Sequence, residues 1–493
     1  MWLSTANTTV RRAARGAERG EPNSFTGAGV NPQNRRAFLR QSGTLAGAAM
    51  LTPSLQGLIA CSRTSSAATD AAQRPRTAPR GEGGYGILRD AGPELALPAG
   101  FTYSVLSFTG KPMSDGNATP AAFDGMAAFA LANGNVRLIR NHENRDAPAN
   151  ARVKGDASRA YDARGGGGTT SLEVRIAPGG TASLVRDFVS LNGTIVNCAG
   201  GPTPWGSWLS CEESVEGRAQ GWAQEHGYIF EVPAAVESPV TPVPLKAMGR
   251  FIHEAVAVDP NTGIVYETED RQIAGFYRFL PRRRGALAEG GRLEMLAIEG
   301  RPNYDTADKQ QMGTTLPVHW VSIDQPDPSG TWGDSAAVFA QGFTKGGARF
   351  SRLEGCWWGD GGVFFHATNG GDAKVGQVWF YRPTSADAGE LTLVFESPSA
   401  EVLNYPDNVT VSPRGGVVIC EDGGGEQFIR GLTRDGRIFD FARNILNRTE
   451  FAGACFSPDG GTLFLNIMGS TSDAGKEKGV TVAIRGPWSD GAL

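Results

Sequence analysis

One short pattern recurs along the chain and constrains its fold more than any other feature: an apolar run, a turn rich in Pro and Gly, and a second apolar run. Three copies align directly, at 255–266, 409–419 and 454–465. Looser copies lie at 125–139, 199–209 and 355–366. Each copy predicts a β-hairpin, because Pro, Gly, Asn and Asp favour tight turns between strands. Six such hairpins predict an all-β fold, a six-bladed β-propeller in which small antiparallel sheets repeat radially.

The composition agrees with a fold that has many turns. The 493 residues include 67 glycines, spread along the whole length, which argues against coiled coils and helical bundles. A pair of two-sheet sandwich domains is the alternative, but it leaves the recurrence of one hairpin unexplained. The net charge of -4 and the lack of a long basic run argue against nucleic acid as a partner.

The N-terminal residues are typical of an export signal. Asn34-Arg35-Arg36-Ala37-Phe38-Leu39 precedes a weakly apolar stretch at 42–60, which is the twin-arginine pattern. Residues 58–62 resemble a lipoprotein box in which Cys61 is acylated; cleavage near Ala67 and a basic disordered arm are the alternatives. We therefore predict a signal peptide over 1–61, a tether over 62–92 and the propeller over 93–493. The protein is expected in the periplasm or outside the cell, with membrane contact only through Cys61.

Polar residues flank the hairpins at one end, where the first strand of each begins and the second ends. Before the first strands stand Asp124, Asn197, Cys198, His253, Glu254, Arg352, Glu354, Asp407, Asn408 and Glu450. After the second strands stand Asn141, His142, Glu143, Cys211, Glu212, Glu213, Glu267, Thr268, Glu269, Asp270, Asn369, Glu421, Asp422 and Asn466. If the hairpins are the innermost ones of the blades, these residues surround the mouth of the central channel.

Such a ring of carboxylates predicts bound cations. Two like charges about 4 Å apart repel by roughly 4 kcal/mol at an effective dielectric constant of 20. Solvated loop ends explain any single carboxylate, but not the whole set. Oxygen-rich groups suit Ca²⁺, whereas a thiolate beside glutamates suits iron or another transition metal.

Several segments resemble one known family. The stretch from Asn192 to Glu213, which contains Asn197-Cys198-Ala199-Gly200-Gly201 and Thr203-Pro204-Trp205-Gly206, is the most specific. The others are Gly249 to Ala255, Pro406-Asp407-Asn408 and Ser412 to Gly416. Together they resemble the PhoX-type alkaline phosphatases, over about residues 95–490.

The resemblance implies a six-bladed propeller that holds iron(III) and calcium ions and hydrolyses phosphate monoesters. Cys198 would then bind iron, Glu254 and Glu354 would bind or bridge iron and calcium, and Arg352 would grip the substrate phosphate with its planar guanidinium. The remaining implied calcium ligands are Asp407, Asn408, Glu421 and Glu450. Glu213 joins the predicted metal ligands as a member of the ring, and Arg352 and Glu254 are the predicted catalytic residues.

The residues themselves leave other functions open. A phosphodiesterase or another calcium-dependent ester hydrolase is one alternative, and a non-catalytic binding propeller braced by metal ions is the other. The expected partners are small phosphorylated substrates, and the chain is expected to be a monomer.

Overall fold

Each of the six repeated sequence patterns forms an antiparallel pair of strands. The computed structural model describes residues 84–148, 153–328, 336–472 and 475–493. The pairs are β4 (Phe123–Ala130) with β5 (Val136–His142), β8 (Asn197–Pro202) with β9 (Ser207–Glu212), β11 (His253–Val258) with β12 (Val265–Glu269), β16 (Leu353–Gly359) with β17 (Gly362–Ala367), β20 (Pro406–Val411) with β21 (Val417–Glu421), and β24 (Phe451–Phe456) with β25 (Leu463–Ile467).

The turns follow the sequence pattern. After β20, the Ser412 hydroxyl accepts hydrogen bonds from the backbone N–H groups of Arg414 (3.2 Å) and Gly416 (3.1 Å). Gly415 has a φ of 86°, a conformation that only glycine adopts at little cost. The Ser-Pro-x-Gly-Gly sequence therefore closes the hairpin locally, before any tertiary contact forms.

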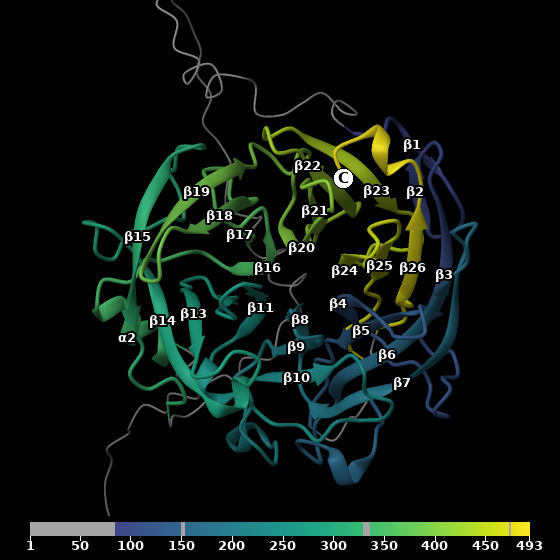
Figure 1. The fold of residues 1–493 in the computed structure, drawn as a ribbon, viewed down its shortest axis with the longest axis horizontal. Coiled ribbons are helices and arrows are strands. Elements are labelled where there is room, and N and C mark those ends of the chain that lie inside the picture. The colour runs from purple at the N-terminus through teal and green to yellow at the C-terminus, as the bar shows by residue number, and fades with distance from the viewer. Residues whose placement is uncertain (1–83, 149–152, 329–335, 473–474) are drawn as a thin grey trace, which may run out of the picture. The chain divides into compact units, whose positions relative to one another are not determined.

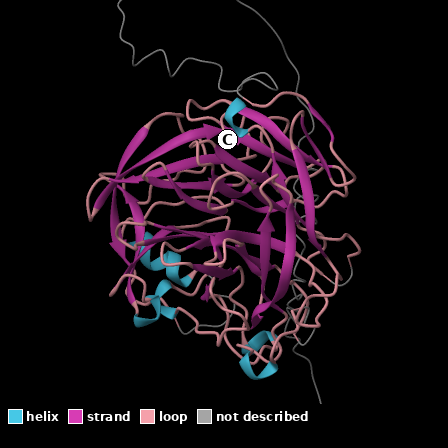
Figure 2. Ribbon diagram, turned by 45° about the vertical axis from the view of Figure 1, so that its right-hand side comes forward, coloured by secondary structure: helices cyan, strands magenta, loops and turns pink. Residues whose placement is uncertain are grey.

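The first strands of the six pairs form a ring. Strands β4, β8, β11, β16, β20 and β24 contact one another in this order, and β24 contacts β4 (Figure 1). The other strands of each sheet extend outward from this ring (Figures 1 and 2). The predicted all-β propeller is thereby confirmed, with the repeated hairpins at its centre.

Outer strands complete five hydrogen-bonded sheets among the described residues. The outer strands are β6 (Gly167–Ile176), β7 (Ala182–Thr194), β10 (Ile229–Pro233), β13 (Phe276–Pro281), β14 (Gly291–Ile298), β15 (Thr315–Ser322), β18 (Gln377–Pro383), β19 (Ala388–Glu396), β22 (Phe428–Leu432), β23 (Ile438–Asn444) and β26 (Val480–Arg485). Strands β15 and β19 pair and join two hairpin units into one nine-stranded sheet. The count of six blades therefore stays a prediction.

N-terminal strands complete sheets that the C-terminal half begins. Strand β3 (Thr102–Phe108) pairs with β26, and β2 (Leu95–Pro98) pairs with β23. Strand β1 (Leu88–Asp90) pairs with β2, although it lies within 62–92, the segment predicted as a tether. Its side chains are exposed or half-buried, so no apolar pattern marks it in the sequence.

Apolar side chains fill the space between neighbouring hairpin units. Phe276 of β13 and Phe365 of β17 stack with their ring centroids 4.2 Å apart, for example, and both are fully buried. At the centre of the ring lies a cavity of only about 10 Å³. Every inner strand contributes to its lining, which includes Gly125, Ala199, Ala255, Gly355, Asn408 and Ala454.

Helical structure is sparse in the described ranges. One helix, α2 (Ala337–Thr344), accompanies the short 3₁₀ segments η1 (Ala157–Arg159), η2 (Arg218–Gln220), η3 (Lys246–Met248), η4 (Leu287–Glu289) and η6 (Trp488–Asp490). Within the described residues, no helix has the length and apolar character to cross a membrane. The predicted signal peptide, Cys61 and most of the tether lie outside those residues, and their boundaries stay predictions.

Candidate metal centre and substrate site

All six inner strands carry the same irregularity near their first residue. In each pair, three steps along the first strand match two along the second, so two residues face one. The first residue of this bulge is Asp124, Cys198, Glu254, Glu354, Asp407 or Gly453, in chain order. A bulge re-aims its side chain relative to the regular pleat. Five of the six repeats therefore place a metal-binding type of side chain at an equivalent position.

The sixth repeat has glycine there for a steric reason. Gly453 has a φ of 61°, and a Cβ atom at this position would lie 2.4 Å from the Asp124 carbonyl oxygen. Its N–H donates to the Asn408 side-chain oxygen (2.8 Å). Close approach of two inner strands thus excludes a ligand at this position.

A second set of equivalent residues follows the second strand of each pair. The backbone N–H of each donates to the carbonyl oxygen just before the first strand, over 2.9–3.2 Å. The donors are Glu143, Glu213, Asp270, Thr368, Asp422 and Met468, and the acceptors are Ala122, Val196, Ile252, Arg352, Tyr405 and Glu450. This bond ties both ends of every hairpin together, so the two sets of side chains lie at the same end of the ring.

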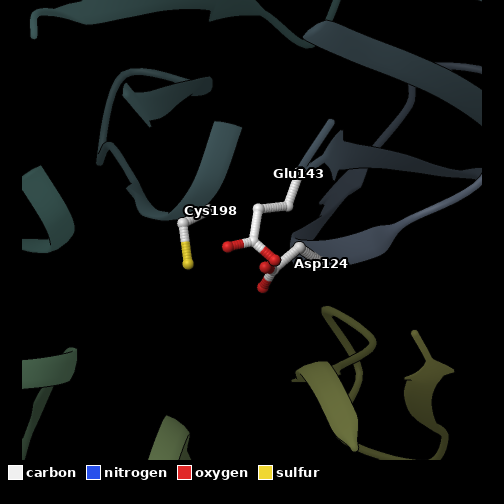
Figure 3. Close-up of side chains that lie close together, drawn as sticks. All are labelled: Asp124, Glu143 and Cys198. Atoms are coloured by element: carbon white, nitrogen blue, oxygen red, sulfur yellow. The ribbon is translucent and has the colours of Figure 1, made fainter. Parts of the chain in front are cut away.

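Four overlapping groups of side chains result, each with ligand atoms within 4.8 Å of one another. They are Asp124 with Glu143 and Cys198, Cys198 with Glu213 and Glu254, Glu254 with Glu354 and Asp407, and Asp407 with Asp422 and Glu450. Figure 3 shows the first group, in which the carboxylates of Asp124 and Glu143 lie beside each other near the Cys198 sulfur. Cys198, Glu254 and Asp407 each belong to two groups, so the four groups form one continuous series.

The chemistry of these donors fits metal ions. All members are buried except Asp422, which is half-buried. Two carboxylates 4.8 Å apart repel by roughly 3.5 kcal/mol at an effective dielectric constant of 20. Burial raises the pKa of the Cys198 thiol well above its usual range, and the charges of Asp124, Glu254 and Glu213 raise it further. A bound cation offsets the repulsion between the carboxylates and lowers the pKa of the thiol, because it stabilises the carboxylates and the thiolate together.

Arg352 lies beside this series. Its Nε and Nη2 atoms donate to the two Asp270 carboxylate oxygens at 2.8 Å each, and Nη2 also donates to Glu354 (2.8 Å). Arg352 has a φ of 46° and directly precedes β16, in the position that Glu450 occupies before β24. The side chain is 11% exposed. Asp270 therefore holds a partly accessible guanidinium against the third group.

The structure brings together most of the predicted site residues. Cys198, Glu213, Glu254, Glu354, Asp407 and Glu450 all belong to the four groups. Asn408 lies at the ring as well, but its oxygen accepts from Gly453 and its amide donates to Asp407 (3.0 Å).

Glu421 does not belong to the four groups, and its predicted role as a calcium ligand stays a prediction. Its carboxylate accepts from Arg430 (2.7 Å) and from the backbone N–H of Asn404 (2.9 Å), inside the sheet. The next residue, Asp422, lies in the fourth group instead. Glu421 is the last residue of β21, and successive side chains of a strand point to opposite sides, so only one of the two can reach the centre.

The same alternation separates Glu212 from Glu213. The Glu212 carboxylate contacts His226 Nδ1 (2.6 Å), while His226 Nε2 contacts Asp162 (3.3 Å), and all three side chains are fully buried. Burial alone lowers the pKa of His226, but the two carboxylates outweigh it and raise the pKa to about 9. This Glu-His-Asp cluster fixes the end of β9 at Glu212, next to Glu213.

Asp124, Glu143 and Asp422 are in the groups although they were not among the predicted site residues. All three were among the polar residues at the hairpin ends, and the signal that identifies them is position. Asp124 is the first bulge residue of its hairpin, as Cys198 is of the next. Glu143 and Asp422 directly follow the second strand of their hairpins, as Glu213 does.

The match to a solved PhoX structure supports this fold. PhoX of Pseudomonas fluorescens in complex with vanadate, a transition-state analogue, matches with a TM-score of 0.63 and 19% identity, over 83% of this chain and 98% of that one. A gluconolactonase of Xanthomonas campestris matches with a TM-score of 0.37 and 11% identity, over 81% of this chain and 100% of that one. Virginiamycin B lyase of Staphylococcus aureus matches with a TM-score of 0.35 and 12% identity, over 78% and 99%.

No curated protein matches the sequence. The model of the family described as alkaline phosphatase PhoX, however, matches residues 84–470, which span the described hairpins and every member of the four groups. The chain therefore belongs to the alkaline phosphatase PhoX family.

Proposed function

We propose that this protein is an exported, metal-dependent phosphatase that hydrolyses phosphate monoesters at a cluster of iron and calcium ions. Family membership supports a phosphatase. The observation that supports a cluster of metal ions is the continuous series of four groups, linked through Cys198, Glu254 and Asp407.

The donor types differ along the series, and this supports two kinds of ion. Cys198 contributes a thiol to the first two groups. The Cys198 sulfur lies 3.2 Å from a Glu254 carboxylate oxygen. A thiolate with carboxylates suits iron. The last two groups contain only carboxylates, which suit calcium. When bound, such cations supply Lewis-acid stabilisation of the phosphoryl oxygens and lower the pKa of coordinated water.

Arg352 is the proposed substrate-binding residue on the protein side. The bidentate bond to Asp270 orients its guanidinium before substrate arrives. A preoriented guanidinium stabilises the charge on phosphoryl oxygens at little further entropic cost. Asp270 is thus a positioning residue. Glu254 belongs to both central groups, so it would contribute to the binding of both kinds of ion.

The export route also belongs to this proposal. The twin-arginine pattern at 34–39 and a lipid anchor at Cys61 would place the enzyme, as a monomer, where small phosphorylated substrates from outside the cell can reach it.

Elemental analysis beside an assay with p-nitrophenyl phosphate, before and after chelation, tests the proposal. The expected result is iron with calcium, and activity that chelation removes. Cys198→Ala should lose iron and activity and keep calcium, whereas Cys455→Ala, which removes another buried sulfur outside the groups, should keep both. Calcium without iron, together with no hydrolysis, would contradict the proposal and favour another hydrolase or a binding protein.

A further inference from the structure

Three polar side chains outside the four groups occupy one equivalent position in their hairpins. Asn141, His366 and Asn466 each stand in the second strand of a hairpin, two residues before the residue whose N–H bond ties the hairpin ends together. All three side chains are fully buried. A polar side chain buried beside the ring needs a hydrogen-bonding partner there.

Each of the three donates a hydrogen bond to the next hairpin around the ring. The acceptor is the backbone carbonyl of the first bulge residue of that hairpin, and this bulge residue is a member of the groups. The bonds are Asn141 Nδ2 to Cys198 O (2.9 Å), His366 Nδ1 to Asp407 O (2.8 Å) and Asn466 Nδ2 to Asp124 O (2.7 Å). The same contact therefore recurs at three of the boundaries between neighbouring hairpins.

The bulge explains why a side chain supplies this bond. A bulge interrupts the ladder of backbone hydrogen bonds, and a buried carbonyl without a ladder partner needs another donor. Since a carbonyl oxygen only accepts, the Nδ1 atom of His366 carries the proton. The carbonyl carbon is bonded directly to the Cα atom of the ligand residue, so a donor that fixes the carbonyl also fixes the direction of the Cα–Cβ bond.

The bonds from Asn141 and His366 act on different parts of the series. Cys198 belongs to the two groups that contain the thiol, whereas Asp407 belongs to the two groups that contain only carboxylates. The Asn141 bond therefore bears on the donors proposed for iron, and the His366 bond bears on the donors proposed for calcium.

We infer from these contacts that Asn141, His366 and Asn466 are positioning residues, each of which orients the ligand residue of the next hairpin for metal binding. This inference rests on the proposed function, which assigns Cys198 to iron and Asp407 to calcium. The competing explanation is that the three bonds only stabilise the propeller, so that the loss of any one of them affects all ions equally.

Chelator titration of the metal-loaded full-length protein, with bound iron and calcium measured by elemental analysis, is the primary test. Asn141→Leu should weaken iron binding by about tenfold or more, because a buried carbonyl loses its donor, and should leave calcium binding as in wild type. His366→Leu should weaken calcium binding and leave iron binding. Asn192→Leu is the matched control and should change neither, since Asn192 is also buried and donates to a carbonyl, that of Asp156 (3.1 Å), outside the four groups.

A variant that restores the donor separates positioning from packing. His366→Asn should recover most of the calcium affinity, because an Asn amide makes the equivalent bond at Asn141 and Asn466. Asn141→Asp loses the same donor as Asn141→Leu but keeps the oxygen that Trp208 and Ser210 contact, so it replaces Asn141→Leu if that variant does not fold. Equal loss of iron and calcium in the Asn141 and His366 variants would overturn the inference, and so would no loss in either.

A thiol measurement distinguishes failure of this inference from failure of the proposed function. If the wild-type protein binds no iron, the proposed function fails, and the rate at which iodoacetamide alkylates Cys198 in the metal-free protein then decides the role of Asn141. This rate, followed by peptide mass spectrometry, should rise in Asn141→Leu and stay as in wild type in Asn192→Leu. An equal rate in all three proteins would overturn the inference.

Discussion

Replacing Gly355 with alanine should disturb the metal site without changing any ligand. Gly355 is the second bulge residue of β16, next to Glu354, and it faces the neighbouring strand β20. A Cβ atom at this position would lie 2.4 Å from the Asp407 carbonyl oxygen and 2.8 Å from the Val409 nitrogen. Since Cβ atoms essentially never approach closer than 3.0 Å, β16 and β20 must separate by at least 0.6 Å.

The size of the effect follows from the ligands on these strands. Glu354 and Asp407 stand on β16 and β20 and belong to one group, so separating the strands separates two carboxylates that the proposal assigns to one ion. Overpacking of this kind costs about 1–3 kcal/mol. If ion binding must restore the native spacing, ion affinity should fall by about 5- to 150-fold, because each 1.4 kcal/mol corresponds to a factor of ten.

The assay is a chelator titration of the loaded protein with the bound metal measured by elemental analysis. Gly424→Ala is the control, because a Cβ atom at Gly424 would have no heavy atom within 4 Å and its backbone is not left-handed. Gly355→Ala should release ions at lower chelator concentration than wild type, and Gly424→Ala should not. If the two variants lose metal at the same chelator concentration, the ring spacing does not control the site and this reasoning is refuted.

Three further predictions concern charge. Chelation should lower the melting temperature, and more so at low salt, because the bare carboxylates repel one another; a melting temperature that chelation leaves unchanged would contradict this. Asp422→Asn should reduce the bound metal but leave the stability of the chelated protein near that of chelated wild type, whereas Glu421→Gln should keep the metal and lower stability, since it weakens the buried pair with Arg430; elemental analysis with urea unfolding distinguishes them. His226→Gln should destabilise the protein by roughly 3 kcal/mol near pH 6, since the pKa is raised from 6.5 to about 9 in the fold. That difference is fully present below pH 6.5 and should shrink as the pH rises through 9, so an equal loss at both extremes of pH would refute it.

Much of the fold was predictable from the residues, because hairpins are local structures. The turns after β20 and β24 are specified by Ser-Pro-x-Gly-Gly and Ser-Pro-Asp-Gly-Gly, whose side chains and glycines close the turn without distant contacts. Strand β1 was not predictable, because its pairing partner and not its own apolar pattern makes it a strand. The joining of two hairpin units through β15 and β19 is likewise a pairing between segments about 70 residues apart.

The candidate site divides in the same way. Polar runs such as Glu212-Glu213 and Glu421-Asp422 mark the correct end of each hairpin, but not which member reaches the centre. In both runs the second residue belongs to a metal group, and the first is held by a buried partner, His226 or Arg430. Those partners come from other strands or loops, so the choice between adjacent carboxylates depends on packing that a local pattern does not encode.

By itself, the sequence determined the repeated hairpin, the acidic end of each copy and membership in a phosphatase family, because each depends on residues near one another in the chain. Only the tertiary structure decided which donors lie close enough together to hold an ion and which arginines lie beside them. Every group combines side chains from at least two hairpins, and Arg145 contacts Glu213 across 68 residues of chain. Such groups exist only once the inner strands close into a ring, which brings equivalent positions of neighbouring hairpins within a few ångströms of one another.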